Sequence, residues 1–252
     1  MEVFPFLSIP VAAITMKEMV NLADESVREN KQLWYVDLNA SKVAALQDDN
    51  DLFNCLKNCD IVGADGKSIV WASRFLGNPL PERIAGIDIM ENLVSLAYQK
   101  GYKCFFFGAK ENIVHKLVET YSLTYSPDII AGYRNGYYQP AEEAEIVRQI
   151  IDSRANILFV ATSSPKQEMF LYNHRNSLIT VNFMMGVGGS FDVIAGLRKR
   201  APVWMQKMGL EWIVRLIQEP RRMWRRYLIG NFRFLKIVWM EKFKKQFLPS
   251  AK

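Results

Sequence analysis

The chain has 252 residues, half of them apolar, which is enough to bury one large core, and its net charge is +6. The charge is uneven, because residues 198–245 hold 14 Lys and Arg against three Glu, whereas residues 1–197 hold 17 Lys and Arg against 23 Asp and Glu. A basic tail on an acidic body predicts an anionic partner for the tail. We expect no signal peptide and no membrane-spanning segment, and three cysteines without a framework spacing indicate a reducing compartment.

Apolar spacing predicts a regular order of elements along the chain. In chain order they are a helix over 16–29, a strand over 33–38, helices over 41–46 and 51–58, a strand over 60–65, helices over 67–76 and 88–99, a strand over 103–109, a helix over 111–121, a strand over 128–134, a helix over 141–154, a strand over 156–162, a helix over 165–173 and a strand over 178–186. Asp88 is expected to cap its helix and Gly101 to end it.

Alternation of helices with continuously apolar strands indicates an α/β fold. We therefore predict a Rossmann-like parallel sheet with helices on both faces over residues 1–196, followed by a basic helical appendage over residues 197–252. In such sheets, ligands bind at the carboxyl ends of the strands. The residues expected at that edge are Asn39, Asp65, Gly108, Gly132–Arg134, Ser163–Gln167 and Gly186–Asp192.

Two anion sites are predicted next to each other near the end of the last strand. Gly186, Gly188 and Gly189 allow bare backbone N–H groups to approach a phosphate. The arginines around Arg222 and Arg225 are suited to a second, more exposed anion. This pairing favours an enzyme that joins a nucleotide-activated donor to a phosphorylated or membrane-bound acceptor.

Asp65 has two interpretations, which are compatible with each other. It lies between a strand end and a helix start, so it is suited to capping that helix. A carboxylate at this edge is equally suited to act as a general base that takes a proton from an attacking hydroxyl.

Three other polar residues are candidates for the same edge. Arg83 and Asp88 either brace their loop as a salt bridge or contact a pyrophosphate or sugar. Gln167, at the start of its helix, is placed to read hydroxyl groups of a sugar or base. We expect no metal site, because the Asp49-Asn50-Asp51 triplet falls between helices and is typical of a solvated turn, and because neither the histidines nor the cysteines have metal-ligand spacing.

The tail beyond Pro220 is predicted to be an amphipathic helix. One face holds Trp224, Leu228, Phe232, Leu235, Trp239 and Phe243, and the opposite face holds Arg222, Arg226, Arg233, Lys236 and Lys244. This pattern favours an anionic membrane surface as the partner. Packing on the chain's own body or on a second copy, in a homo-oligomer, stays open. No nucleic-acid-binding module is visible, so we expect no nucleic acid partner.

Several strings resemble the WecG/TagA/CpsF family of bacterial glycosyltransferases across nearly the whole chain. They are DLNA (37–40), ADG (64–66), ERIAGID (82–88), FFGA (106–109), GYRNGYY (132–138), PKQE (165–168) and the block that begins with GVGGSFD (186–192). The resemblance implies inverting, metal-independent transfer of a sugar from a UDP donor, with no cofactor. The implied acceptor is an undecaprenyl-diphosphate-linked sugar, and the implied location is the inner face of the cell membrane.

The resemblance also implies roles for individual residues. Asp65 matches the catalytic base of the ADG motif, and Asn39, Arg83 and Gln167 match polar residues that line the pocket. Around Arg215, Arg222 and Arg225, the arginines match an appendage that closes over the site and holds the acceptor diphosphate.

Two departures from the family pattern affect the expected sugar specificity. Asp37 stands where the family usually has Thr or Val, and residues 161–164 replace a usual glycine pair. The competing classes are a nucleotide-sugar epimerase or oxidoreductase, and a non-enzymatic membrane scaffold. An epimerase or oxidoreductase would require a GxGxxG motif after the first strand and a Tyr-x-x-x-Lys pair, and the sequence contains neither. A non-enzymatic scaffold would not explain why polar residues follow so many of the predicted strands.

Overall fold

The computed structural model of the chain describes residues 1–247, apart from the side chains of residues 222, 226 and 245–247. Its centre is an eight-stranded sheet in the order β1-β2-β4-β3-β8-β7-β5-β6. The strands are β1 (Val3–Phe6), β2 (Ile9–Ala12), β3 (Leu33–Leu38), β4 (Ile61–Ala64), β5 (Cys104–Gly108), β6 (Ile130–Arg134), β7 (Ile157–Ala161) and β8 (Phe183–Gly186). All neighbouring strands are parallel except β1 and β2.

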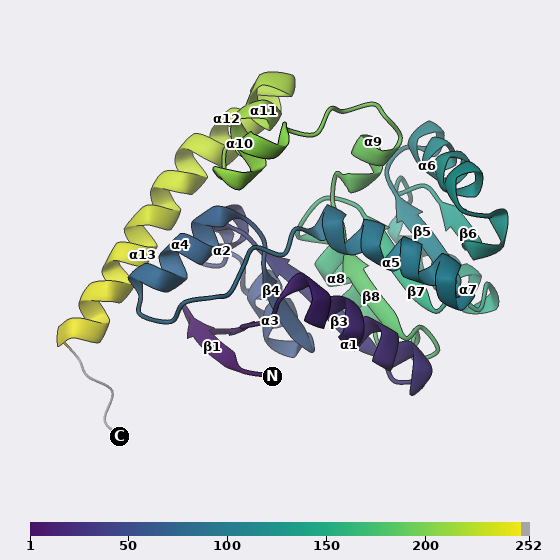
Figure 1. The fold of residues 1–252 in the computed structure, drawn as a ribbon, viewed down its shortest axis with the longest axis horizontal. Coiled ribbons are helices and arrows are strands. Elements are labelled where there is room, and N and C mark those ends of the chain that lie inside the picture. The colour runs from purple at the N-terminus through teal and green to yellow at the C-terminus, as the bar shows by residue number, and fades with distance from the viewer. Residues whose placement is uncertain (248–252) are drawn as a thin grey trace.

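Helices cover both faces of this sheet, so the predicted Rossmann-like α/β fold is confirmed (Figure 1). They are α1 (Met16–Arg28), α2 (Ala40–Ala45), α3 (Asn50–Asn58), α4 (Lys67–Phe75), α5 (Gly86–Lys100), α6 (Glu111–Thr124), α7 (Glu143–Asp152), α8 (Lys166–His174), α9 (Ser190–Ile194), α10 (Val203–Lys207), α11 (Glu211–Gln218), α12 (Pro220–Trp224) and α13 (Gly230–Phe247). Short 3-10 turns at Pro127–Ile129 and Pro140–Glu142 precede β6 and α7, and a π turn at Arg225–Ile229 joins α12 to α13.

Strand alternation builds a separate core on each face of the sheet. In β3, Trp34, Val36 and Leu38 point into the core beneath α2, α3 and α8, whereas Tyr35 points into the core beneath α1 and α5. Asp37 follows the same alternation as Tyr35 and lies at the end of the strand, where the core gives way to a cavity. The buried strands thus deliver polar residues to one edge.

Three sequence predictions need correction. The hairpin β1–β2 was not predicted, and it makes the sheet mixed rather than purely parallel. The last strand covers only Phe183–Gly186, because residues 178–180 form a turn, after which Val181 N donates to Leu178 O (2.9 Å). Asp88 does not cap α5, because Ala85 is the cap and Asp88 lies in the first turn, but Gly101 does end the helix in a left-handed conformation (φ 74°).

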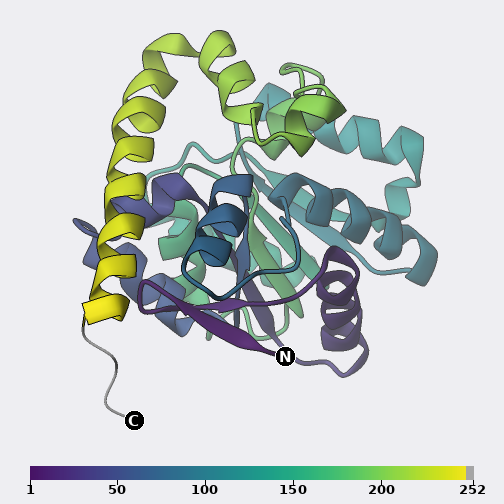
Figure 2. The same ribbon diagram turned by 60° about the vertical axis from the view of Figure 1, so that its left-hand side comes forward.

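The C-terminal helix packs on the body and still exposes an aromatic face. Figures 1 and 2 show α13 running alongside α2 and α4. Phe234 and Val238 are buried in the core next to α2, and Arg233 Nη1 lies 2.8 Å from Asp48 Oδ2. The face predicted to contact a membrane, from Trp224 to Phe243, is exposed. Within the part of the chain that the structure describes, no helix is long and apolar enough to cross a bilayer.

Candidate active site

The carboxyl ends of the strands border one cavity of about 1660 Å³. Loops after β3, β4, β5, β7 and β8 line it, together with α4 and the helices from α11 to α13. The predicted site residues in its lining are Asn39, Asp65, Arg83, Gln167, Gly186, Gly188, Gly189, Asp192 and Arg215. The convergence of polar strand ends expected from the sequence is therefore present in the structure.

Asp65 lies directly after β4 and faces this cavity. Its backbone N–H donates to Leu38 O (2.8 Å), and Gly66, with φ of 99°, occupies the cap position of α4 without a side-chain hydrogen bond. The interpretation of Asp65 as a helix cap is thus wrong, and its carboxylate, 28% exposed, is left for other contacts.

The surroundings of Asp65 bring its pKa close to neutrality. Burial and then the Asp37 carboxylate raise the pKa of Asp65 to about 6, with a further contribution from Glu211, against the opposing charges of Arg83 and Arg215. Arg83 Nε lies 3.5 Å from Asp65 Oδ1. A carboxyl group with such a pKa is half ionised near pH 6 and is suited to accept a proton at neutral pH.

Arg83 and Asp88 do not form the salt bridge that the sequence suggested. Arg83 Nη2 instead lies 2.5 Å from Glu211 Oε2 on α11, and Asp88 pairs with Arg200 (2.6 Å). Asp88 does not line the cavity, because its carboxylate is directed to Arg200. The first turn of α11 is therefore held against the loop before α5 by an ion pair that no short motif predicts.

A buried ionic cluster, formed by Asp37, Lys42 and Glu168, lies beside Asn39. Lys42 Nζ is 2.6 Å from Asp37 Oδ1 and 2.8 Å from Glu168 Oε1, and the Lys42 side chain is only 3% exposed. Burial alone would lower the pKa of Lys42, but the two carboxylates raise it, so the lysine is charged. Asn39 caps α2 through Lys42 N (3.1 Å) and donates to Asp37 Oδ2 (3.1 Å). The cluster fixes the orientation of Asn39.

Gln167 connects this cluster to the glycine turn after β8. Its Nε2 donates to Glu168 Oε1 (2.8 Å), and its Oε1 accepts from Gly188 N (3.1 Å). A Cβ at Gly186 would lie 2.5 Å from Gln167 Nε2, so that glycine is needed for close packing. The Gly188 N–H, which was predicted to bind a phosphate, is occupied by Gln167. Beyond the turn, Asp192 pairs with Arg198 (3.5 Å).

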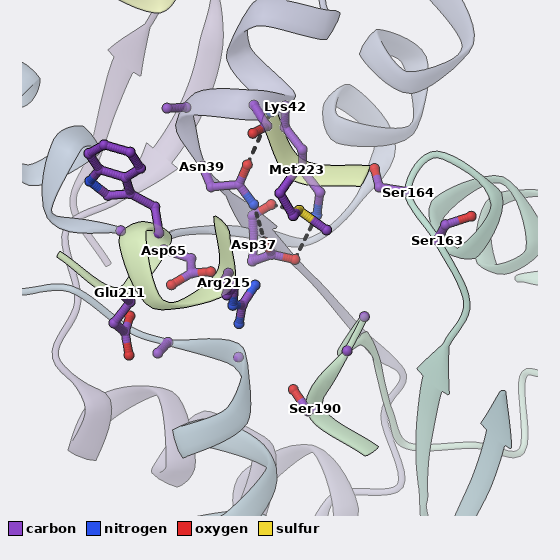
Figure 3. Close-up of a pocket in the computed structure, with 18 of the residues that line it drawn as sticks. Asp37, Asn39, Lys42, Asp65, Ser163, Ser164, Ser190, Glu211, Arg215 and Met223 are labelled. Atoms are coloured by element: carbon purple, nitrogen blue, oxygen red, sulfur yellow. Dashed lines mark hydrogen bonds and ion pairs between the residues drawn. The ribbon is translucent and has the colours of Figure 1, made fainter. Parts of the chain in front are cut away.

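The helices after residue 202 supply one wall of the cavity. Arg215 hydrogen-bonds Tyr227, and although burial disfavours its charge, Tyr227, Asp65 and Glu211 together raise its pKa. In Figure 3, Arg215 and Glu211 lie beside Asp65, and Met223 of α12 is drawn among the residues that line the same cavity. Met223 is buried, so α12 is seated in the cavity.

The other two arginines of the prediction are placed differently from Arg215. Arg225 lies against the ring of Trp224, with 5.3 Å between the guanidinium carbon and the ring centroid, and does not line the cavity. The Arg222 side chain lies outside the described residues.

The sequence prediction missed Lys42, Glu168 and Glu211. Glu168 lies within the PKQE motif, and Glu211 lies within the block that begins at Gly186, but neither string identifies the partner of its carboxylate. Lys42 resembles an ordinary surface lysine near the start of a helix, and only its distance to two carboxylates shows its position.

The residues set aside in the metal prediction have structural contacts. Asp49 caps α3 through Leu52 N (2.9 Å), and His174 lies 3.0 Å from Glu143. Cys55 and Cys104 are buried thiols, and burial raises the pKa of Cys55 to about 12. Among the residues that the structure describes, no group of three or more His, Cys, Asp or Glu side chains is arranged to hold a metal ion.

Comparison with known proteins places nearly all of the described chain in one family. The family model of the glycosyl transferase WecG/TagA/CpsF family matches residues 4–247. An N-acetylglucosaminyldiphosphoundecaprenol N-acetyl-beta-D-mannosaminyltransferase of Bacillus subtilis is 38% identical over 201 residues, which are 80% of this chain and 77% of the relative. A protein of the same name from Bacillus spizizenii is 37% identical over 173 residues, 69% of this chain and 66% of the relative. The chain therefore belongs to the WecG/TagA/CpsF family and is a glycosyltransferase.

Proposed function

We propose that the protein transfers an N-acetylhexosamine-type sugar from a UDP-sugar to an undecaprenyl-diphosphate-linked sugar, with inversion at the anomeric carbon. The single observation that supports this most is the Asp65 carboxylate, which faces the cavity, has a pKa of about 6, and lies between Arg83 and Arg215. The names of the two relatives support the choice of acceptor and sugar class.

The proposed reaction is a single displacement. Asp65 takes the proton of the acceptor hydroxyl as its oxygen attacks the anomeric carbon of the donor. The bond from that carbon to the UDP oxygen breaks, and UDP leaves with the electron pair. Arg83 and Arg215, which both line the cavity, stabilise the developing negative charge. This mechanism uses no metal or other cofactor.

The two sides of the cavity bind different substrates in this proposal. We assign the donor to the strand-end side, where Asn39, Gln167, Gly186 and Asp192 lie. The acceptor diphosphate is assigned to the appendage side, to Arg215 with Arg222 and Arg225. Since Arg225 lies in the π turn after α12 and outside the cavity lining, this role requires a movement of that turn when the acceptor binds.

We further propose that residues 197–252 form a membrane-associating appendage on the catalytic body. This segment carries most of the excess positive charge and the exposed face from Trp224 to Phe243, which suits an anionic lipid surface. The enzyme would work as a peripheral protein on the inner face of the bacterial cell membrane. Association of several copies is compatible with the same exposed face.

Release of UDP from a panel of UDP-sugars tests the function. The acceptor is a short-chain prenyl-diphosphate N-acetylhexosamine, and a chelator is present throughout. Release from one donor that depends on the acceptor and is unaffected by the chelator is the expected result. No release from any donor, with or without added membranes, would contradict the proposal.

A further inference from the structure

The cavity that contains Asp65 continues into an apolar cleft between α4 and α13. Large apolar side chains predominate in the lining there, beside Lys67 and Lys236, although it is the same cavity. These side chains are Trp71 and Phe75 on α4 and Phe232, Leu235 and Trp239 on α13, and each is between 49% and 72% exposed. We refer to this part of the cavity as the α4–α13 cleft.

The walls of the cleft are fixed by contacts elsewhere on the same helices. On α13, Phe234 and Val238 are buried against the core, and Arg233 is paired with Asp48. On α4, Ile69 and Val70 are buried in that core. The exposed aromatic side chains are therefore additional to the packing that holds the two helices. Exposed apolar surface of this kind marks a site for an apolar ligand or partner.

Position along the helices gives the cleft a direction. Asp65 lies two residues before the start of α4, and Tyr227, which bonds Arg215, lies in the π turn that leads into α13, so both walls start near the polar site and lead away from it. From Tyr227 to Trp239 the helix advances about 18 Å, at 1.5 Å per residue. Further along, Lys242 Nζ lies 5.3 Å from the ring centroid of Phe75 and joins the two helices.

We propose that the α4–α13 cleft binds the first isoprene units of a prenyl-diphosphate ligand, whose diphosphate lies near Arg215. This inference rests on the proposed function for the identity of the ligand and adds the site of its apolar chain. A cationic site followed directly by an apolar channel matches a molecule with a diphosphate at one end and a hydrocarbon chain at the other.

Continuity with the cavity favours this occupant over two others. Of the exposed face from Trp224 to Phe243, a bilayer surface would meet the members that do not line the cavity, which are Trp224, Leu228 and Phe243. A second copy of the chain seated in the cleft would cover its apolar side chains and would not use the polar part of the cavity around Arg215. Only a ligand that spans the polar and apolar parts uses the whole cavity.

Calorimetric titration of the full chain, without vesicles and without donor, tests the cleft directly. The probes are farnesyl diphosphate and isopentenyl diphosphate, which share the anion and differ in chain length. We expect the farnesyl compound to bind at least tenfold more tightly. The variants Phe75→Ser and Trp239→Ser are expected to lose that preference and keep the affinity for isopentenyl diphosphate. Leu123→Ser, on an exposed position of α6 outside the cavity, is the matched control.

The other possible outcomes distinguish binding of a prenyl chain in the cleft from binding of a second copy of the chain, and from failure of the proposed function. Equal affinity of the wild type for both probes would overturn the proposal, as would an unchanged preference in both cleft variants. A dimer in sedimentation that Trp239→Ser dissociates, with farnesyl affinity unaltered, would assign the cleft to a second copy. Farnesyl binding in a protein that transfers no sugar would leave the cleft standing and contradict the proposed function instead.

Discussion

Glu211 Oε2 lies 2.5 Å from Arg83 Nη2, so an acidic side chain of α11 holds an arginine of the candidate active site. The same arginine reaches Asp65 at 3.5 Å. Arg83 therefore connects the proposed catalytic base with the helices that cover it. Because both ends of the Arg83–Glu211 pair are largely shielded from water, we expect this contact to contribute more than a surface ion pair does.

Substitution of Glu211 by Gln should loosen the covering helices. Hydrogen bonds to charged groups contribute roughly 1.5–3 kcal/mol, so local opening of residues 203–227 is expected to become easier by about that amount. Hydrogen exchange measured by mass spectrometry would show faster exchange in this segment and no change in the sheet. Glu29→Gln, which removes the exposed pair with Lys31, is the control. Unaltered exchange over residues 203–227 would refute the holding role of Glu211.

The acid limb of the pH–rate profile should report the environment of Asp65. With a pKa of about 6, its reactive form is lost below that pH, so kcat/KM should fall tenfold per pH unit there. Burial and then the Asp37 charge raise this pKa, so Asp37→Asn should move the limb to lower pH by roughly one unit. Asp152→Asn, on the exposed side of α7, should leave it in place. A limb that does not move in Asp37→Asn would contradict the assignment.

Asp65 should also lower the stability of the fold when it is ionised. Its pKa in the folded protein is about 6, above its ordinary value of 3.8, so its favourable contribution is present below pH 3.8 and is lost as the pH rises through 6. Asp65→Asn should therefore be more stable than the wild type at pH 8, by at most about 3 kcal/mol at 1.36 kcal/mol per pKa unit. Urea denaturation at pH 8 and pH 4 measures the difference, which should nearly vanish at pH 4. A variant less stable than the wild type at pH 8 would show that ionised Asp65 stabilises the fold.

Lys42 should be essential to folding rather than a replaceable surface lysine. Lys42→Met leaves the Asp37 and Glu168 carboxylates buried without their cation, and breaking a buried pair in this way costs roughly 3–5 kcal/mol. Adding Glu168→Gln should recover part of the loss. Lys116→Met, which removes an exposed pair with Glu119, should cost less than about 1 kcal/mol. Equal losses in urea denaturation for the two lysine variants would be inconsistent with the buried cluster.

Local patterns in the sequence were sufficient to predict most of the fold. The continuously apolar strands from β3 to β7 could be placed because buried parallel strands need no polar alternation. Gly101 was identified because a helix commonly ends at a residue in the left-handed region. The β1–β2 hairpin was missed because each strand has only four residues and contains a proline, which weakens the strand pattern.

The candidate site was predictable in position and not in its pairings. The predicted strand ends were sufficient to place Asn39, Asp65 and Gly186 at one edge of the sheet, because parallel strands bring their carboxyl ends together. The partners of charged residues depended on contacts across the fold, such as Arg83 with Glu211 and Lys42 with Glu168. Sequence spacing carries no information about such pairs, and for that reason a salt bridge between Arg83 and Asp88, one of the two alternatives considered, was wrong.

The amphipathic interpretation of the tail was incomplete for a similar reason. The predicted amphipathic pattern correctly placed the apolar residues from Trp224 to Phe243 on one exposed face of the helix. It gave no role to Phe234 and Val238, which are the residues that seat α13 on the body. A helix with two apolar faces has a weak pattern, because burial on one side and exposure on the other use the same residue types.

Single-turnover transfer by the wild type and by Asp65→Asn tests the role of Asp65 as the general base most directly. The reaction contains a saturating UDP-sugar donor, a prenyl-diphosphate N-acetylhexosamine acceptor and a chelator, and UDP affinity is measured separately by calorimetry. General base catalysis contributes typically 10²–10⁴-fold, so the variant should lose at least about 100-fold in rate and keep its affinity for UDP. A rate within about tenfold of the wild type would remove Asp65 from the chemistry.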